Sequence, residues 1–302
     1  MSRKANKIKQ RVSNIFSAAG FLTPGLILFF IFFLLPLVYS FRISMFDWNA
    51  IRPEKSEFIG IANYLEVIKD PIFLRSVINT IGYTIVTVSM QMFFGIFIAI
   101  LLDRNIKGKT AFRVLYYLPV VTSWVIVSLL FEYMFNGQAG LINYVLVDVL
   151  HIAKDNIQWF ADPILAMIPI SVLGIWKGMG WTAVIYLAGL QSVPSSLYEA
   201  ARVDGANSVK MFTKITMPYL KSITAFLVVV LTIGGLNAYI SGLLMTDGGN
   251  PMDLTHFVLT LMYEETFTNM NFGVGSAISV LLTVFVFIIS FFQMKMLLKG
   301  ED

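Results

Sequence analysis

The chain contains no cysteine among its 302 residues and only two histidines. Without thiols it can form no disulfide, thiolate metal site or cysteine nucleophile, and its redox compartment stays undetermined. Charge is scarce as well: Asp, Glu, Lys and Arg make up 13% of the residues, whereas 57% are apolar. An ordinary soluble domain is roughly a quarter charged. This composition therefore predicts an integral membrane protein.

Six segments are long and apolar enough to cross the hydrocarbon core of a bilayer, which needs about 20 helical residues. Because no water is available there to hydrogen-bond peptide groups, each segment should be helical, or irregular only where protein covers it. The predicted fold class is an all-α integral membrane protein with six transmembrane helices. Lys177 is the one charged residue within them. The spans are expected at about 15–41, 76–102, 114–131, 163–190, 222–246 and 266–294.

A single membrane domain is expected at 15–298, preceded by an N-terminal tail at 1–14. The first span is interpreted as a retained helix, since its uncharged stretch exceeds the 7–15 residues of a signal-peptide core. The largest loops have about 30 residues, which is too short for an independent core. No tandem repeat of 20–50 residues indicates a solenoid.

Basic residues are distributed unevenly between the loops. Fifteen Lys and Arg residues lie in 1–14, 103–113, 191–221 and the tail at 295–302, whereas the loops between these segments carry few and hold many of the acidic residues. Basic loops of membrane proteins face the cytoplasm. Both termini and the loop 191–221 are therefore expected on the cytoplasmic side.

The loop between the fourth and fifth spans contains two predicted short helices. Ser196 and Glu199 have the spacing of a capping box, and Gly205 suits the left-handed conformation that ends a helix. Asn207 or Ser208 can cap the second helix. The resulting helix–turn–helix is expected to lie along the membrane face, and these signals alone also fit an amphipathic connector.

Residues 199–218 resemble the EAA motif in the membrane-spanning subunits of ABC importers: Glu-Ala-Ala, three residues, Gly, nine residues, Ile, one residue, Leu-Pro. The chain departs from this pattern only at Met217. The resemblance implies a type I ABC importer permease fold with a cytoplasmic coupling helix between spans four and five. The residues that it implies for coupling to an ATPase are Glu199, Ala200, Ala201, Asp204, Gly205, Phe212 and Pro218.

The resemblance covers about 20–298 and is strongest for the carbohydrate-type permeases, the group of the maltose and glycerol-phosphate transport subunits. It rests on segments such as 58–64, 140–143 and 187–191, and departs from the group at Asn250-Pro251. It implies an oligosaccharide or polyol-like solute and a prokaryotic plasma or inner membrane. The implied partners are a second homologous permease, an extracytoplasmic solute-binding protein and two ATPase subunits that carry ATP and Mg. No nucleic acid is implied, and no cofactor bound by this chain.

Two other classes of membrane protein remain as alternatives. An autonomous secondary transporter should carry Asp, Glu or His within its spans for ion coupling, and the predicted spans contain none. A polytopic membrane enzyme, the less favoured alternative, would need a catalytic cluster at membrane depth. The chain itself is not expected to be an enzyme. A phosphate-binding loop ending at Gly108-Lys109-Thr110 would require glycine where the sequence has Asp103.

Polar and aromatic side chains within the spans are the candidates for contact with a solute. A lysine at the bilayer centre costs about 2.5–3.5 kcal/mol, so Lys177 should face protein or a wet cavity, or snorkel to the surface. Amides and phenols can hydrogen-bond a sugar, or equally a neighbouring helix. The two histidines are isolated, so no metal site is expected. The substrate-pathway candidates are Asn237, Tyr239, Tyr186, Trp181, Gln91 and Lys177.

Overall fold

Long helices make up most of the structure, a computed structural model that describes residues 19–103 and 108–298. The predicted tail at 1–14 lies outside these ranges. Within them, five helices are long and apolar enough to cross a bilayer, and the bent pair α5–α6 supplies a sixth crossing if it counts as one span. The predicted all-α fold class is confirmed. The spans are Ala19–Ile43, α4 (Pro71–Asp103), α5 (Lys109–Val121) with α6 (Trp124–Met134), α8 (Pro163–Gln191), Lys221–Met245 and α15 (Phe272–Leu298).

Shorter elements make up or connect these spans. The first span contains η1 (Phe30–Leu34) and α2 (Leu35–Ile43), and the fifth consists of α12 (Lys221–Leu236) and α13 (Ile240–Met245). Strands β1 (Phe46–Asp47) and β2 (Glu57–Phe58) form an antiparallel pair. The other elements are η2 (Pro53–Lys55), α3 (Ala62–Lys69), α7 (Leu141–Asn143), η3 (Tyr144–Val149), α9 (Ser195–Val203), α10 (Ser208–Met211), η4 (Phe212–Thr216), α11 (Met217–Tyr219), α14 (Val258–Tyr263) and η5 (Glu264–Thr268).

The segment predicted as the third span, 114–131, is not one straight helix. It contains parts of α5 and α6, which are bent by 96° relative to each other. Pro119 lies in the last turn of α5, where it donates no N–H and its ring crowds the preceding turn. Thr122 and Ser123 then take extended conformations that redirect the chain. Apolar length locates this segment but does not reveal the bend.

The starts of two other spans are set by the residues just before them. The fourth, predicted at 163–190, is α8, and the Asp162 side chain caps its first turn by accepting two backbone hydrogen bonds. The sixth, predicted at 266–294, begins only at Phe272. It starts late because η5 forms a separate turn of helix before it.

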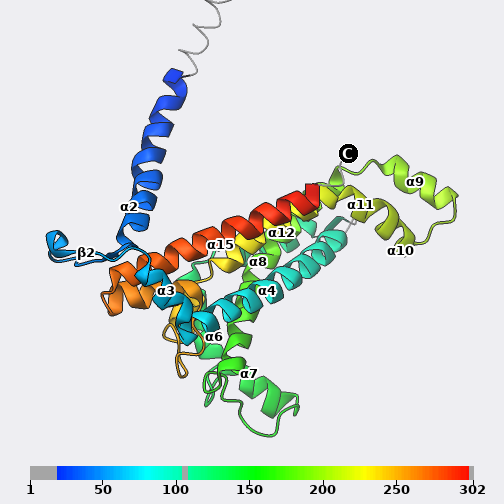
Figure 1. Cartoon of the computed structure of the whole chain (residues 1–302). Helices are drawn as coiled ribbons and strands as arrows, with labels where there is room; N and C mark the ends of the chain where they lie inside the picture. Colours follow the sequence, from blue (N-terminus) through cyan, green and yellow to red (C-terminus); the bar gives the residue numbers. More distant parts are fainter. Residues whose placement is uncertain (1–18, 104–107, 299–302) are drawn as a thin grey trace, which may run out of the picture.

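The first span stands apart from the other helices. Figure 1 shows it rising away from the bundle, with α2 near its base. Its α2 part contacts α15, and its most apolar stretch has no buried residue. An exposed apolar helix of 25 residues requires lipid or another membrane helix around it.

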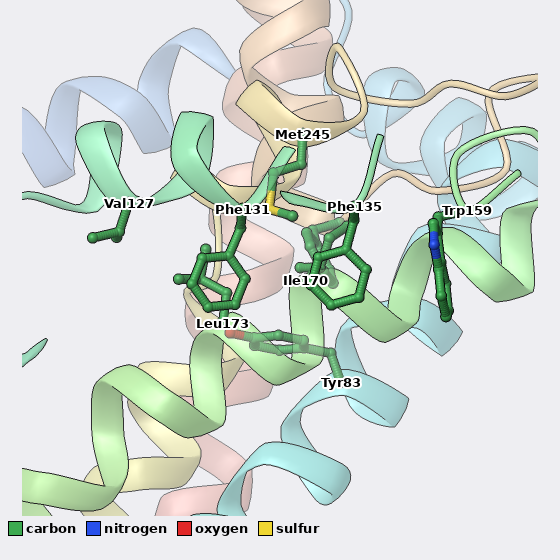
Figure 2. Packing of buried hydrophobic residues seen from close by; sticks show 9 residues of the cluster. Tyr83, Val127, Phe131, Phe135, Trp159, Ile170, Leu173 and Met245 are labelled. Carbon is green, nitrogen blue, oxygen red and sulfur yellow. The ribbon is translucent and has the colours of Figure 1, made fainter. Parts of the chain in front are cut away.

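The bent segment is held on α8 by an aromatic cluster. Figure 2 shows Phe131 of α6 and Phe135, the residue after its end, projecting towards α8 and α4, which contribute Leu173 and Tyr83. The Phe135 ring also meets Trp159 edge-to-face, with centroids 5.2 Å apart. Packing of this kind buries most of each ring and fixes its direction. The cluster therefore fixes the position of α6 after the bend.

Glycines allow α8 to approach its neighbours closely. A Cβ at Gly95 of α4 would lie 2.5 Å from the Thr182 side chain, and one at Gly180 would lie 2.2 Å from the backbone oxygen of Tyr116 in α5. Small residues at helix contacts are common in membrane proteins because they let backbones approach. The α5–α8 contact thus depends on the missing side chain at Gly180.

Gly180→Ala should loosen this contact, because the new methyl group meets a backbone atom that cannot rotate away. Overpacking of this kind costs about 1–3 kcal/mol, and thermal melting of the detergent-solubilised protein should show a lower Tm. Gly82→Ala is the matched control, since a Cβ there meets nothing within 4 Å. Equal melting temperatures for the two variants would contradict the close packing.

Candidate functional site

A cavity of about 600 Å³ lies between α4, α8, α12 and the bent segment. Five of the six predicted pathway residues line it, and they come from α4, from α8 and from the break after α12. The side chains that they contribute combine amides, aromatic rings and one ammonium. Their role in transport stays a prediction. The five are Gln91, Lys177, Trp181, Asn237 and Tyr239.

The sixth candidate, Tyr186, lies outside the cavity wall. Its side chain is 2% exposed and packs in a cluster with Leu187, Leu220 and Leu227. Its hydroxyl donates to Oγ1 of Thr224 over 3.3 Å. The structure therefore places Tyr186 at the contact of α8 with α12, where it holds the two helices together.

Lys177 ends at the break between α5 and α6. Its Nζ atom donates to the backbone oxygens of Pro119 at 2.9 Å, Val120 at 3.4 Å and Thr122 at 2.6 Å. It also lies 5.0 Å from the ring centroid of Trp124. The sequence left three possible surroundings for Lys177. In the structure its side chain faces protein at the edge of a cavity, and it does not snorkel to the membrane surface.

This contact satisfies both partners. The last carbonyls of a helix lack intrahelical donors and carry the negative end of the helix dipole, and an ammonium has three N–H donors and no acceptor. Three carbonyls therefore engage the three donors of Lys177, which is 5% exposed. The Trp124 ring adds a cation–π contact. The buried charge is thus used to hold the bend.

A second break, between α12 and α13, forms another part of the wall. Asn237 follows the last residue of α12, and its amide donates to the backbone oxygen of Ile233 over 2.7 Å. Tyr239 then leaves helical geometry, with φ −146° and ψ −61°. Irregular backbone at membrane depth is tolerated where it lines a cavity. The polar side chains here are consequently displayed at a gap between helices.

Several lining residues were not selected from the sequence as site residues, among them Thr87, Trp124 and Ser241. Trp124 could have been found only by recognising Pro119 as the end of a helix, since the turn that follows points it at Lys177. Thr87 and Ser241 give no comparable signal, because a hydroxyl in a span is as common at helix contacts.

The segment 194–218 is the second candidate site. Gly205 has φ +73°, the left-handed conformation predicted for it, and Asn207 caps α10 by accepting from the Lys210 N–H over 2.8 Å. The predicted capping box at Ser196 does not form. Helix α9 begins two residues earlier than a Ser196 cap would place it, at Ser195 after Pro194, with no side-chain cap.

The same segment offers an exposed surface. Figure 1 shows α9 and α10 projecting beyond the end of the bundle. Glu199, Ala200 and Gly205 are exposed, as is Val203, an apolar residue with 89% of its surface accessible. The base of α9 is tied back by the Tyr198 hydroxyl, 2.9 Å from Oγ1 of Thr216 in η4. The segment therefore presents both charged and apolar side chains at its surface.

Comparison with known proteins identifies the fold and the family. A family model described as "Binding-protein-dependent transport system inner membrane component" matches residues 91–299. The chain belongs to this family. The match includes both breaks, the cavity residues from Gln91 onwards and the segment 194–218. The permease is therefore a membrane subunit of a transport system that works with a binding protein.

Individual proteins resemble the permease over nearly its whole length. The probable ABC transporter permease protein YurN of Bacillus subtilis is 32% identical, with 93% of this chain and 96% of that protein covered. The trehalose/maltose transport system permease protein MalF of Thermococcus litoralis is also 32% identical, covering 95% and 94%. In structure, a bacterial ABC transporter subunit for import of the acidic polysaccharide alginate matches with a TM-score of 0.83 at 22% identity, over 98% of this chain and 100% of that one.

Lys177→Met should release the bend, because the carbonyls of Val120 and Thr122 lose their donor while that of Pro119 keeps its hydrogen bonds from Thr122, and an unsatisfied buried polar group costs about 1–3 kcal/mol. Hydrogen–deuterium exchange should rise in peptides spanning the end of α5 and the start of α6. Lys154→Met, at an exposed loop lysine, should leave the same peptides unchanged. Identical exchange in both variants would show that Lys177 does not hold the bend.

Proposed function

We propose that the permease is one of two membrane subunits in an ATP-driven importer of a neutral oligosaccharide or similar polyol. A second homologous permease completes the pathway, and an extracytoplasmic binding protein delivers the solute. Two ATPase subunits bind ATP and Mg, and one of them docks on 194–218. The distribution of Lys and Arg supports cytoplasmic termini and a cytoplasmic coupling segment. A related alginate transporter is described in complex with a periplasmic protein bound to an alginate pentasaccharide.

The proposal of a neutral solute rests on the chemistry of the cavity wall. Apart from Lys177, the described residues that line the cavity are uncharged, and they include the aromatic rings of Trp124, Trp181, Tyr83 and Tyr239. Flat rings bind the apolar faces of sugars, while a few amides and hydroxyls fix their orientation. The donors of Lys177 are engaged by carbonyls. An anionic solute would therefore find no free cationic donor there.

These features favour a neutral solute over an acidic one. Among the similar proteins, the Thermococcus permease is named for trehalose and maltose, whereas the structurally similar transporter is described for acidic alginate. The wall of this cavity suits a neutral sugar such as trehalose or maltose.

The proposed coupling to the ATPase rests on the exposed surface of α9. Ala200 lies on a helix with few other contacts, and its small side chain allows a partner backbone to approach closely. Glu199 offers a carboxylate to a basic residue of the ATPase. Because Gly205 and Asn207 fix the turn to α10, a push on α9 moves the pair as one unit towards α12.

Gly205→Val should abolish uptake in vesicles that contain the assembled transporter and its binding protein. A Cβ in the left-handed region costs about 1–2 kcal/mol and a branched residue fits worst, so the turn should open. Gly205→Asn is the matched control, because asparagine tolerates this conformation. We expect Asn to retain at least half of the wild-type uptake and ATPase stimulation, and Val to lose at least nine-tenths.

The assay also measures how much ATPase subunit co-purifies with each variant. Both variants should still insert, since position 205 lies outside every span. Wild-type uptake by Gly205→Val would show that 194–218 is a connector without a coupling role, and the proposed function would lose its main mechanical element.

A further inference from the structure

A stripe of aromatic rings leads out of the cavity along α14 and η5. Leu259 in the first turn of α14 lines the cavity. Tyr263 and Phe267 follow at intervals of four residues, so all three share one helix face. The ring of Tyr263 lies 5.5 Å from that of Tyr239 on the cavity wall and 5.1 Å from that of Phe267. The rings form a continuous series from the cavity outwards.

The series ends at an accessible surface. Phe267 is 55% exposed and lies in η5, beyond the end of α14. In Figure 1 the orange α14–η5 region lies at the opposite end of the bundle from α9 and α10. With α9 and α10 in the cytoplasm, Phe267 lies on the outer side, from which a solute arrives.

The edge of the stripe is polar and acidic. Glu264 pairs with the buried His256 over 3.2 Å, and burial is the main influence that lowers the pKa of this histidine. Glu265 accepts hydrogen bonds from the side chains of Asn269 at 3.0 Å and Asn271 at 2.8 Å. A carboxylate has about four acceptor positions. These groups can accept further hydrogen bonds from sugar hydroxyls, and they disfavour anions.

We propose that Tyr239, Tyr263 and Phe267 form a stacking track that receives a neutral saccharide on the outer side and passes it to the cavity. This inference rests on the proposed function. Aromatic faces are electron-rich and therefore attract the polarised C–H groups on the flat face of a sugar. Three adjacent rings provide several similar binding positions, and conduction requires binding that is favourable enough to enter but weak enough to leave.

The experiment tests whether the track needs the aromatic ring of Phe267 and not only its apolar surface. Phe267→Leu keeps an apolar side chain but removes the ring, whereas Phe267→Trp keeps a ring. Phe287→Leu is the matched control, because Phe287 on α15 is 70% exposed and stacks on Phe291 at 6.4 Å without lining the cavity. The probe is radiolabelled maltotriose, a linear neutral oligosaccharide, in vesicles containing the assembled transporter and its binding protein.

Phe267→Leu should lower kcat/KM for uptake at least fivefold. Phe267→Trp should remain within twofold of wild type, and so should Phe287→Leu. A membrane-interface role for Phe267, which aromatic residues often have, predicts instead that Phe267→Leu and Phe287→Leu behave alike. If the two variants behave alike and the wild-type protein takes up maltotriose, the proposed track is contradicted. The proposed function is then unaffected.

Direct binding gives a second measurement that does not depend on transport. Saturation-transfer NMR on the solubilised transporter, without binding protein, should show transfer to the C–H protons of maltotriose. Replacing both Tyr263 and Phe267 by leucine should reduce this transfer at least threefold, and Phe287→Leu should not change it. Absence of transfer in the wild type would contradict the track. Transfer of the expected kind without any uptake would contradict the proposed function instead.

Discussion

The contact between the Lys177 ammonium and the carbonyls at the end of α5 is the interaction on which the cavity depends. A lysine at this depth is costly, and so are helix carbonyls without donors. Each compensates for the other, so the chain can turn by 96° between α5 and α6. That turn directs Trp124 towards Lys177. It also leaves space on that side of the cavity that a straight third span would occupy.

The arrangement separates three tasks along the length of the bundle. The cavity lies among α4, α8, α12 and the bent segment. The α14–η5 region lies at one end of the bundle, and α9 with α10 lies at the other (Figure 1). A packed cluster that includes Tyr186 and Leu220 joins α4, α8 and α12 between the cavity and the coupling segment. Contiguous packing of this kind offers a physical route by which movement of α9 reaches the cavity.

The spans could be predicted from the sequence because apolar length directly reflects the thickness of the bilayer. The turn at Gly205 could be predicted because it depends on one residue and its neighbours. The bend after Pro119 could not, since proline is tolerated within membrane helices and only the partner Lys177, 58 residues away, decides the geometry. The capping box at Ser196 was displaced for a local reason, because Pro194 starts α9 earlier.

The candidate pathway residues show a similar division. Residue type identified side chains that can bind a sugar, but the direction of each one depends on helix rotation, which the weakly amphipathic spans do not reveal. Gln91 and Tyr186 therefore looked alike, although one lines the cavity and the other packs between helices. The aromatic stripe was missed because Tyr263 and Phe267 lie on either side of the predicted start of the sixth span.

The central claim is that solute passes through the cavity held open by Lys177. The cysteine-free sequence allows a direct measurement with Asn237→Cys, which places a single thiol on the cavity wall, in the assembled transporter. A small thiol reagent should block uptake, and maltotriose delivered by the binding protein should slow the modification, whereas glycerol 3-phosphate should not. Modification that leaves uptake unchanged and proceeds equally fast with maltotriose would contradict the account.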